Sequence, residues 1–168
     1  MKDLDFETLF RALRANTQAL LAARAIRTPR VVGIQTGGVW LAERLAHELG
    51  ILGPIGRLDI SFHRDDFDRA GLHPVVRPSV LPWPVDDAHL LLVDDVLYTG
   101  RTVRAALNEL FDWGRPAAVL LAVLIDRNGR DLPIAADACG TRLTLAASEQ
   151  VRLHGPEPLT LDYKGPRA

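Results

Sequence analysis

The most constraining feature of this sequence is an apolar run that ends in two acidic residues. Residues 90–93 read Leu-Leu-Leu-Val, and Asp94 and Asp95 follow directly. A short, uninterrupted apolar run is typical of a central strand in a parallel sheet, because such a strand is buried on both faces. The segment therefore predicts a buried strand that ends in carboxylates.

A helix and a second buried strand follow this run. Apolar residues at 103, 106, 107, 110 and 111 have helical spacing, and Pro116 prevents the helix from continuing. Residues 117–125 are apolar throughout and predict the next strand. This strand–loop–helix–strand unit favours an α/β fold, a mostly parallel sheet flanked by helices. The other expected elements are helices at 5–25 and 39–49 and strands at 31–34, 58–62, 142–146 and 149–153.

A chain of 168 residues is expected to form a single domain, residues 1–168. Residues 63–88 hold charges, two histidines and four prolines, with little periodicity. A loop of this length is uncommon in a compact domain unless it is a lid or a binding loop. We therefore expect a flexible hood over a substrate site, anchored near Trp83; a plain surface connection is the alternative.

Composition and charge exclude several classes of protein. The formal net charge of −1 argues against strong non-specific binding to nucleic acid or anionic lipid. The single cysteine, Cys139, permits neither an intramolecular disulfide nor a cysteine zinc cluster. No apolar run approaches the roughly 20 residues that cross a bilayer, and the first residues lack a signal-peptide pattern. No membrane association and a cytoplasmic location are therefore expected.

The residues after the apolar run suit two different ligand groups. Thr99, Gly100, Arg101 and Thr102 fall at a helix N-terminus, where free N–H groups and the helix dipole attract phosphate. The carboxylates of residues 94 and 95 would instead accept hydrogen bonds from sugar hydroxyls, or act through a hydrated Mg²⁺. Phosphate at one end and a diol or metal at the other describe a ribose 5-phosphate.

Two rival interpretations of the acidic strand end are weaker. A nucleoside triphosphatase would also place a carboxylate there, but it needs a G-x-x-x-x-G-K-[ST] loop, which this sequence lacks. The carboxylates could also simply cap a loop. The phosphate loop that follows in register favours the ligand-binding interpretation.

Residues 90–102 resemble the 13-residue signature that binds phosphoribosyl pyrophosphate (PRPP) in type I phosphoribosyltransferases. The longer string VDDVLYTGRTVRAAL, then DWGRP and LAVLIDR-x-x-R-x-LPI, resembles one branch closely. That branch comprises the pyrimidine operon attenuation regulators, which are also uracil phosphoribosyltransferases. Further matches are VGI-x-T-x-G, LAERLA and LDIS-x-x-RDD. The resemblance extends over roughly residues 31–134.

The resemblance implies a role for each matching residue. Asp94 and Asp95 would bind the ribose hydroxyls as catalytic carboxylates, and the 5-phosphate would lie on residues 98–102. In full, the implied sites are the phosphate site Tyr98, Thr99, Gly100, Arg101 and Thr102; the pyrophosphate loop Thr36, Gly37 and Gly38, often of unusual peptide geometry; the hood residues Arg64, Asp65 and Asp66; and the base site Val96, Asp126 and Arg127.

The implied reaction converts uracil and PRPP to UMP and pyrophosphate, with Mg²⁺ held through PRPP and water rather than by direct protein ligands. Family members with purine substrates typically carry an aspartate just before the phosphate loop, whereas this chain has Tyr98. That difference favours a pyrimidine; orotate or a purine is the rival substrate. Self-association into a dimer or higher oligomer is also expected from the resemblance.

A UMP-sensing regulator with weak or vestigial catalysis is the rival from another class. Binding a leader RNA requires clustered Lys and Arg. Arg130 and Arg142 are the candidate RNA contacts that remain here, so leader RNA is a disfavoured partner. At six positions this chain departs from the residues that RNA-binding members typically have. It carries Arg14, Gln18, Gly129, Thr141, Ala147 and Gln150 there. The pyrophosphate loop also departs from the family pattern, because Gln35 and Gly37 stand where Lys and Arg are usual.

Overall fold

The computed structural model describes residues 4–60 and 78–165. Their core is a parallel five-stranded sheet of order β2-β1-β3-β4-β5, and a separate antiparallel hairpin pairs β6 with β7. The strands are β1 Arg30–Ile34, β2 Gly56–Leu58, β3 His89–Leu97, β4 Ala118–Arg127, β5 Ala138–Leu143, β6 Gln150–His154 and β7 Thr160–Lys164. The helices are α1 Phe6–Ala23, α2 Gly37–Glu48 and α3 Arg101–Trp113.

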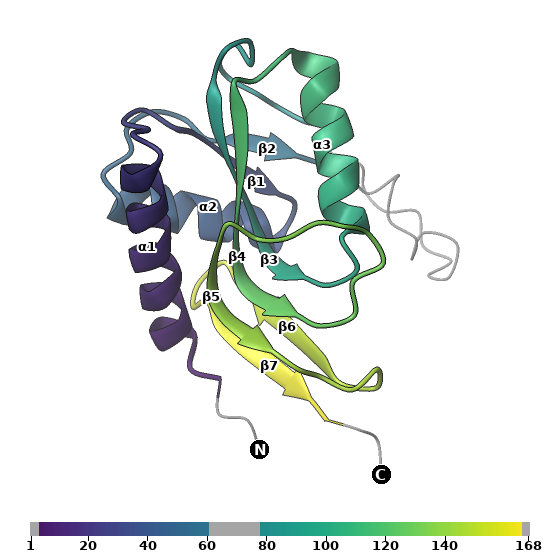
Figure 1. Cartoon of the computed structure of the whole chain (residues 1–168). Helices are drawn as coiled ribbons and strands as arrows, with labels where there is room; N and C mark the ends of the chain where they lie inside the picture. Colours follow the sequence, from purple (N-terminus) through teal and green to yellow (C-terminus); the bar gives the residue numbers. More distant parts are fainter. Residues whose placement is uncertain (1–3, 61–77, 166–168) are drawn as a thin grey trace.

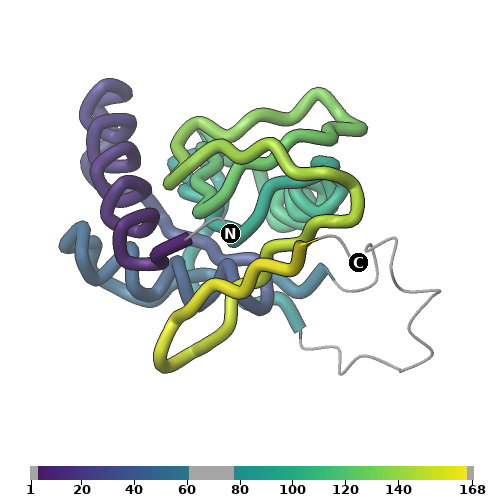
Figure 2. The backbone as a smooth tube through the Cα atoms, turned by 90° about the horizontal axis from the view of Figure 1, so that it is seen from below, coloured from purple at the N-terminus to yellow at the C-terminus, as the bar shows by residue number. Residues whose placement is uncertain are grey.

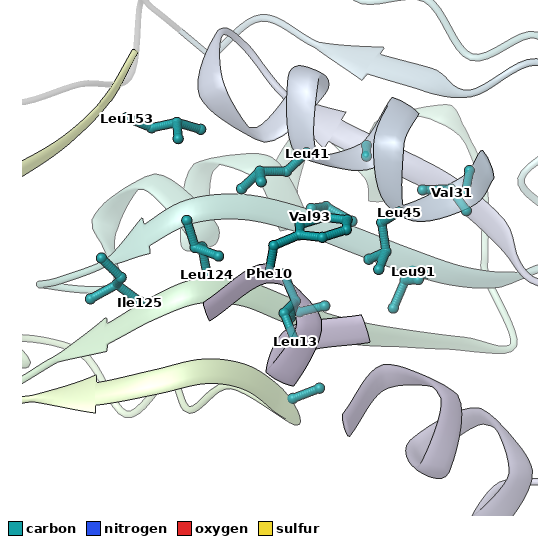
Figure 3. Close-up of a cluster of buried hydrophobic side chains, with 14 of the residues drawn as sticks. Phe10, Leu13, Val31, Leu41, Leu45, Leu91, Val93, Leu124, Ile125 and Leu153 are labelled. Carbon is teal, nitrogen blue, oxygen red and sulfur yellow. The ribbon is translucent and has the colours of Figure 1, made fainter. Parts of the chain in front are cut away.

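The helices cover both faces of the sheet and make three layers (Figure 1). On one face, α1 and α2 pack on Leu91 and Val93 of β3, and Figure 3 shows this cluster around Phe10 and Leu45. On the other face, α3 packs on Leu90 and Leu92. The alternation along β3 explains its continuous apolar run, since successive side chains enter opposite cores.

The predicted α/β fold is confirmed, and the central elements lie close to their expected positions. β3 continues beyond the apolar run through Asp94 and Asp95 to Leu97. The helix expected at 39–49 begins two residues earlier, at Gly37. β2 covers 56–58, ahead of the expected strand at 58–62, whose last two positions lie outside the described residues.

The C-terminal part differs more from the prediction. The strand expected at 142–146 is β5, which covers 138–143 instead, while the strand expected at 149–153 is confirmed as β6. β7 was not predicted. β5 forms one edge of the sheet and most of its residues are only half-buried, so its side chains give a weak apolar pattern.

The described end of the predicted hood packs against the sheet. Val80 forms an antiparallel bridge with Arg57, and Leu81, Trp83 and Val85 are buried in the core under α3. The Trp83 indole N–H donates to the Pro54 carbonyl at 3.1 Å. Residues 63–77 of the predicted hood lie outside the described residues.

None of the helices in the described segments is both long enough and apolar enough to span a bilayer.

Candidate active site

A cavity of about 630 Å³ opens at the carboxyl ends of the central strands. Three of its walls come from the start of α2, the end of β3 with the loop into α3, and the end of β4 at Arg127. The hairpin supplies the fourth wall, and Figures 1 and 2 show it lying beneath this end of the sheet. Ligands of open α/β sheets bind at this edge.

The phosphate loop forms one end of the cavity. Gly100 has φ of 92°, a left-handed conformation that favours glycine, and α3 begins at the next residue. The Thr99 hydroxyl accepts from the Arg101 amide at 3.3 Å, and the Arg101 guanidinium lies 3.3 Å from the Asp131 carboxylate. Side chains at 99, 101 and 102 all line the cavity beside the helix N-terminus. This is the geometry of an anion site.

The turn after β4 braces this loop from behind. The amides of Asp131 and Leu132 both donate to the Thr99 carbonyl, at 2.9 and 3.1 Å. The Arg130 guanidinium pairs with the Asp126 carboxylate and donates to the carbonyls of Leu97, Tyr98, Arg127 and Ile134. Arg130, one of the two candidate RNA contacts, is therefore committed to contacts inside the fold.

The two carboxylates lie at the centre of the cavity. Asp94 is 3% exposed, and its Oδ1 accepts from the Asp95 amide at 3.0 Å. Asp95 is half-buried and accepts from the Val96 amide at 2.8 Å. Both side chains line the cavity beside the phosphate loop, as the two-group interpretation requires.

The predicted pyrophosphate loop lies between β1 and α2, beside the Asp95 carboxylate. The Gln35–Thr36 peptide is cis, the unusual geometry that the resemblance implies. A Cβ at Gly37 would lie 2.5 Å from the Asp95 carboxylate, and one at Gly38 would lie 2.5 Å from the Val93 carbonyl. Only glycines allow the start of α2 to approach β3 this closely. Thr36 and Gly37 line the cavity, and Gly38 is buried behind them.

Arg127, at the end of β4, lines another wall of the cavity, and Val96 of β3 also lines the cavity. Arg127 is 6% exposed, and its guanidinium lies over the Tyr98 ring, 3.9 Å from Cζ to the ring centroid. Asp126, also expected at the base, does not line the cavity. Its carboxylate instead pairs with Arg130 and, at 3.5 Å, with Arg142.

Sequence reasoning missed the hairpin wall of the cavity. Ala147, Gln150 and Arg152 line the cavity, and so does Trp40 of α2, whose ring lies against the hairpin connection at Gly155. These positions follow a weakly patterned segment, and no motif marks them. The hood residues Arg64, Asp65 and Asp66 lie outside the described residues.

The fold is shared with solved phosphoribosyltransferases. A hypoxanthine-guanine phosphoribosyltransferase from Bacillus anthracis superimposes with a TM-score of 0.67 at 15% identity, covering 83% of this chain and 82% of that one. A purine phosphoribosyltransferase from Pyrococcus horikoshii gives a TM-score of 0.63 at 25% identity, covering 83% and 85%. These likenesses concern the fold.

The phosphate-loop helix, the carboxylate pair and this sheet together define the chain as a phosphoribosyltransferase, and the family model described as "Phosphoribosyl transferase domain" matches residues 7–153. "Bifunctional protein PyrR" of Pseudomonas aeruginosa is 57% identical over 152 residues, 90% of this chain and 89% of that protein. The protein of that name from Nitrosococcus oceani is 56% identical over 158 residues, 93% and 89%. The chain belongs to the PyrR family, which confirms the resemblance found in the sequence.

Proposed function

We propose that this protein transfers the phosphoribosyl group of PRPP to uracil and releases UMP and pyrophosphate. One observation carries the proposal. A single cavity is lined by the N-terminus of α3, a carboxylate pair at the end of β3 and a second glycine-bearing loop at the start of α2. PRPP carries the matching groups, which are a 5-phosphate, two ribose hydroxyls and a pyrophosphate.

The groups of PRPP are assigned to the cavity walls in that order. The 5-phosphate would lie on Thr99–Thr102 at the N-terminus of α3. Asp94 and Asp95 would accept hydrogen bonds from the ribose hydroxyls, because ionised carboxylates are acceptors only. The pyrophosphate would lie against Thr36 and Gly37, at the N-terminus of α2.

Mg²⁺ suits this arrangement as a partner of PRPP. The described residues contain no group of three or more His, Cys, Asp or Glu side chains that would hold a metal by themselves. Mg²⁺ usually keeps several waters and binds substrate phosphates, so PRPP and water would hold it, with Asp94 and Asp95 reached through those waters and the ribose hydroxyls. Bound there, the ion would offset negative charge on the departing pyrophosphate.

The chain's own residues would then orient the reactants and exclude water. As the bond from the sugar to pyrophosphate loosens, positive charge develops on the ribose. The neighbouring carboxylates stabilise that charge, while fixed N–H groups hold both phosphates in place. No covalent nucleophile is required.

The base end favours a pyrimidine over a purine. Tyr98 stands where a purine-binding aspartate is typical, and its ring is covered by the Arg127 guanidinium. Arg127 lines the cavity, and two of its five N–H groups donate to main-chain carbonyls, which leaves others for a carbonyl oxygen of the base. Uracil carries such carbonyls at positions 2 and 4.

The test is a PRPP- and Mg²⁺-dependent assay with uracil, orotate, adenine and hypoxanthine in parallel. We expect uracil-selective turnover that is lost, by at least about 100-fold, in an Asp94→Asn/Asp95→Asn variant. Asp112→Asn is the matched control and should retain activity, because Asp112 is exposed on the last helical turn of α3, at the end opposite the phosphate loop. Faster turnover with another base would refute the assignment of uracil, and turnover that survives the double substitution would refute the site.

A regulatory function is the second candidate, because the relatives bear the name "Bifunctional protein PyrR". We propose that leader-RNA binding is weak or absent in this chain. Arg130 is committed to backbone carbonyls, and Arg142, which is 75% exposed, lies 3.5 Å from Asp126. Arg14, on α1, lies 3.8 Å from Glu48. Filter binding to a pyrimidine leader RNA at low salt tests this, and tight, UMP-dependent retention would contradict it.

A further inference from the structure

The buried guanidinium of Arg127 is held by main-chain acceptors from the segment that precedes β6. Its Nη1 donates to the Glu149 carbonyl at 3.1 Å, and its Nη2 donates to the Ala146 carbonyl at 3.4 Å. One face of the group lies on the Tyr98 ring. Arg127 also lines the cavity, so the two carbonyls of the segment 146–149 fix the direction in which its remaining N–H groups point.

The side chain of Glu149 fastens that segment to the hairpin. One carboxylate oxygen accepts from the Ala146 amide at 2.5 Å, and the other accepts from the Tyr163 hydroxyl on β7. The hydrogen bond to Glu149 is the main reason that the pKa of Tyr163 is raised, so this hydroxyl remains a donor through neutral and mildly alkaline pH. A chain of contacts thus runs from β7 through Glu149 to both carbonyls that hold Arg127.

We propose that Glu149 and Tyr163 are positioning residues that fix Arg127 for recognition of the base. The inference rests on the proposed function. An arginine side chain loses much rotational freedom when it is fixed in one geometry. If the fold fixes it in advance, base binding does not bear that cost, and affinity and selectivity for the base both increase.

Tyr163→Phe isolates the contact, because it removes one hydroxyl and keeps the ring. Asp162→Asn is the matched control. Asp162 is the neighbouring residue on β7, and its carboxylate lies 3.9 Å from His154 across the hairpin, a contact that involves neither Glu149 nor Arg127. Each variant removes one polar contact that β7 makes. Tyr163→Phe breaks the chain of contacts that leads to Arg127, and Asp162→Asn leaves it in place.

The measurement compares the affinities of UMP and ribose 5-phosphate by calorimetry. The two ligands share the sugar and the phosphate, so the ratio of their dissociation constants reports the base alone. We expect Tyr163→Phe to weaken UMP binding by about 3- to 10-fold and to leave ribose 5-phosphate within twofold. Asp162→Asn should change neither affinity. Glu149→Ala should lower UMP affinity by more than Tyr163→Phe, and Glu149→Gln, which keeps an acceptor oxygen, should restore part of it.

The outcomes separate this inference from the proposed function. If the wild-type protein binds UMP no better than ribose 5-phosphate, recognition of uracil itself fails, and the positioning role fails with it. If the wild type discriminates and Tyr163→Phe discriminates equally well, only the positioning role is overturned. A parallel loss of both ligands would show a merely structural role. Thermal melts verify folding, and Glu149→Gln provides the same comparison if Tyr163→Phe does not fold.

Discussion

At the scale of single residues, two arginines of one turn have different roles. Arg130 supports the fold, and we assign Arg127 to the ligand. Arg127 and Arg130 both follow the apolar part of β4, and both belong to the string that carries the family resemblance. Arg130 donates to four carbonyls and pairs with a carboxylate, whereas Arg127 donates to two carbonyls within the described structure and also lines the cavity. A sequence pattern that marks both as functional does not reveal this division, because it depends on where the turn directs each side chain.

We predict that Arg130→Ala destabilises the protein and weakens its phosphate site. It removes the donor to the carbonyls of Leu97 and Tyr98, which lead into the phosphate loop, and a partner of Asp126. The expected loss is about 2–4 kcal/mol of unfolding free energy, with a higher KM for PRPP. Arg142→Ala removes the exposed partner of the same carboxylate and should cost less than about 1 kcal/mol. Urea denaturation and PRPP titration of both variants provide the check, and equal losses would contradict the bracing role.

The residues proposed to bind the phosphate and the hydroxyls could be grouped from the sequence because they are contiguous. Asp94, Asp95 and Thr99–Thr102 follow one apolar strand and start one helix, so local rules suffice to place them. Glu149 and Tyr163 are separated from Arg127 by 22 and 36 positions and meet it only through the folded hairpin. Neither belongs to a motif, so a single sequence offers no signal for them.

At the scale of elements, a charged clamp joins α1 to α2 on the outside of the sheet. The Arg44 guanidinium donates to both carboxylate oxygens of Glu7 at 2.8 and 2.7 Å and to Glu48 at 3.1 Å. The same group lies over the Phe10 ring, 4.3 Å from its centroid, and over Phe6 at 5.3 Å. A bidentate contact that also stacks on aromatic rings holds the two helices in register.

This clamp predicts a pH dependence of stability. The hydrogen bond from Arg44 lowers the pKa of Glu7 below its ordinary value of 4.5. A lowered pKa means that the stabilisation is fully present above 4.5 and is lost as the pH falls through the folded-state pKa. Glu7→Gln should therefore destabilise by about 0.5–1 kcal/mol at pH 7 and by less at pH 3.

Urea denaturation at the two pH values measures this difference. Glu109→Gln, on α3 across the sheet, is the control and should show no such change between pH 7 and pH 3. A Glu7→Gln deficit that stays constant with pH would contradict the electrostatic account.

The elements themselves were predictable to different degrees. Helices and central strands have a full apolar stripe or a continuous apolar run, because each packs against a large neighbour. β5 lies at an edge of the sheet and β7 in a two-stranded hairpin, and most of their side chains are half-buried. Their partners determine where they begin and end, so a local pattern could neither position β5 correctly nor reveal β7.

At the scale of the whole molecule, the sheet and the hairpin make separate contributions to the cavity. The parallel sheet gathers the ends of β1, β3 and β4 at one end, which is why sequence rules alone could propose a PRPP site there. The hairpin then closes the far side. The Trp40 ring would lie 2.7 Å from a Cβ at Gly155, so the connection between β6 and β7 packs tightly on α2. Figure 2 shows the hairpin passing below that helix.

The late position of β7 in the chain has a consequence for biosynthesis. Ribosomes synthesise the N-terminal part of a protein first. The phosphate loop and the two carboxylates lie within residues 94–102 and are therefore made well before β7. The hydroxyl that fastens the Arg127 support arrives only at position 163 of 168. A nascent chain would thus possess the proposed PRPP-binding elements before the proposed support of the base site, and discrimination among nucleobases would be the last property to mature.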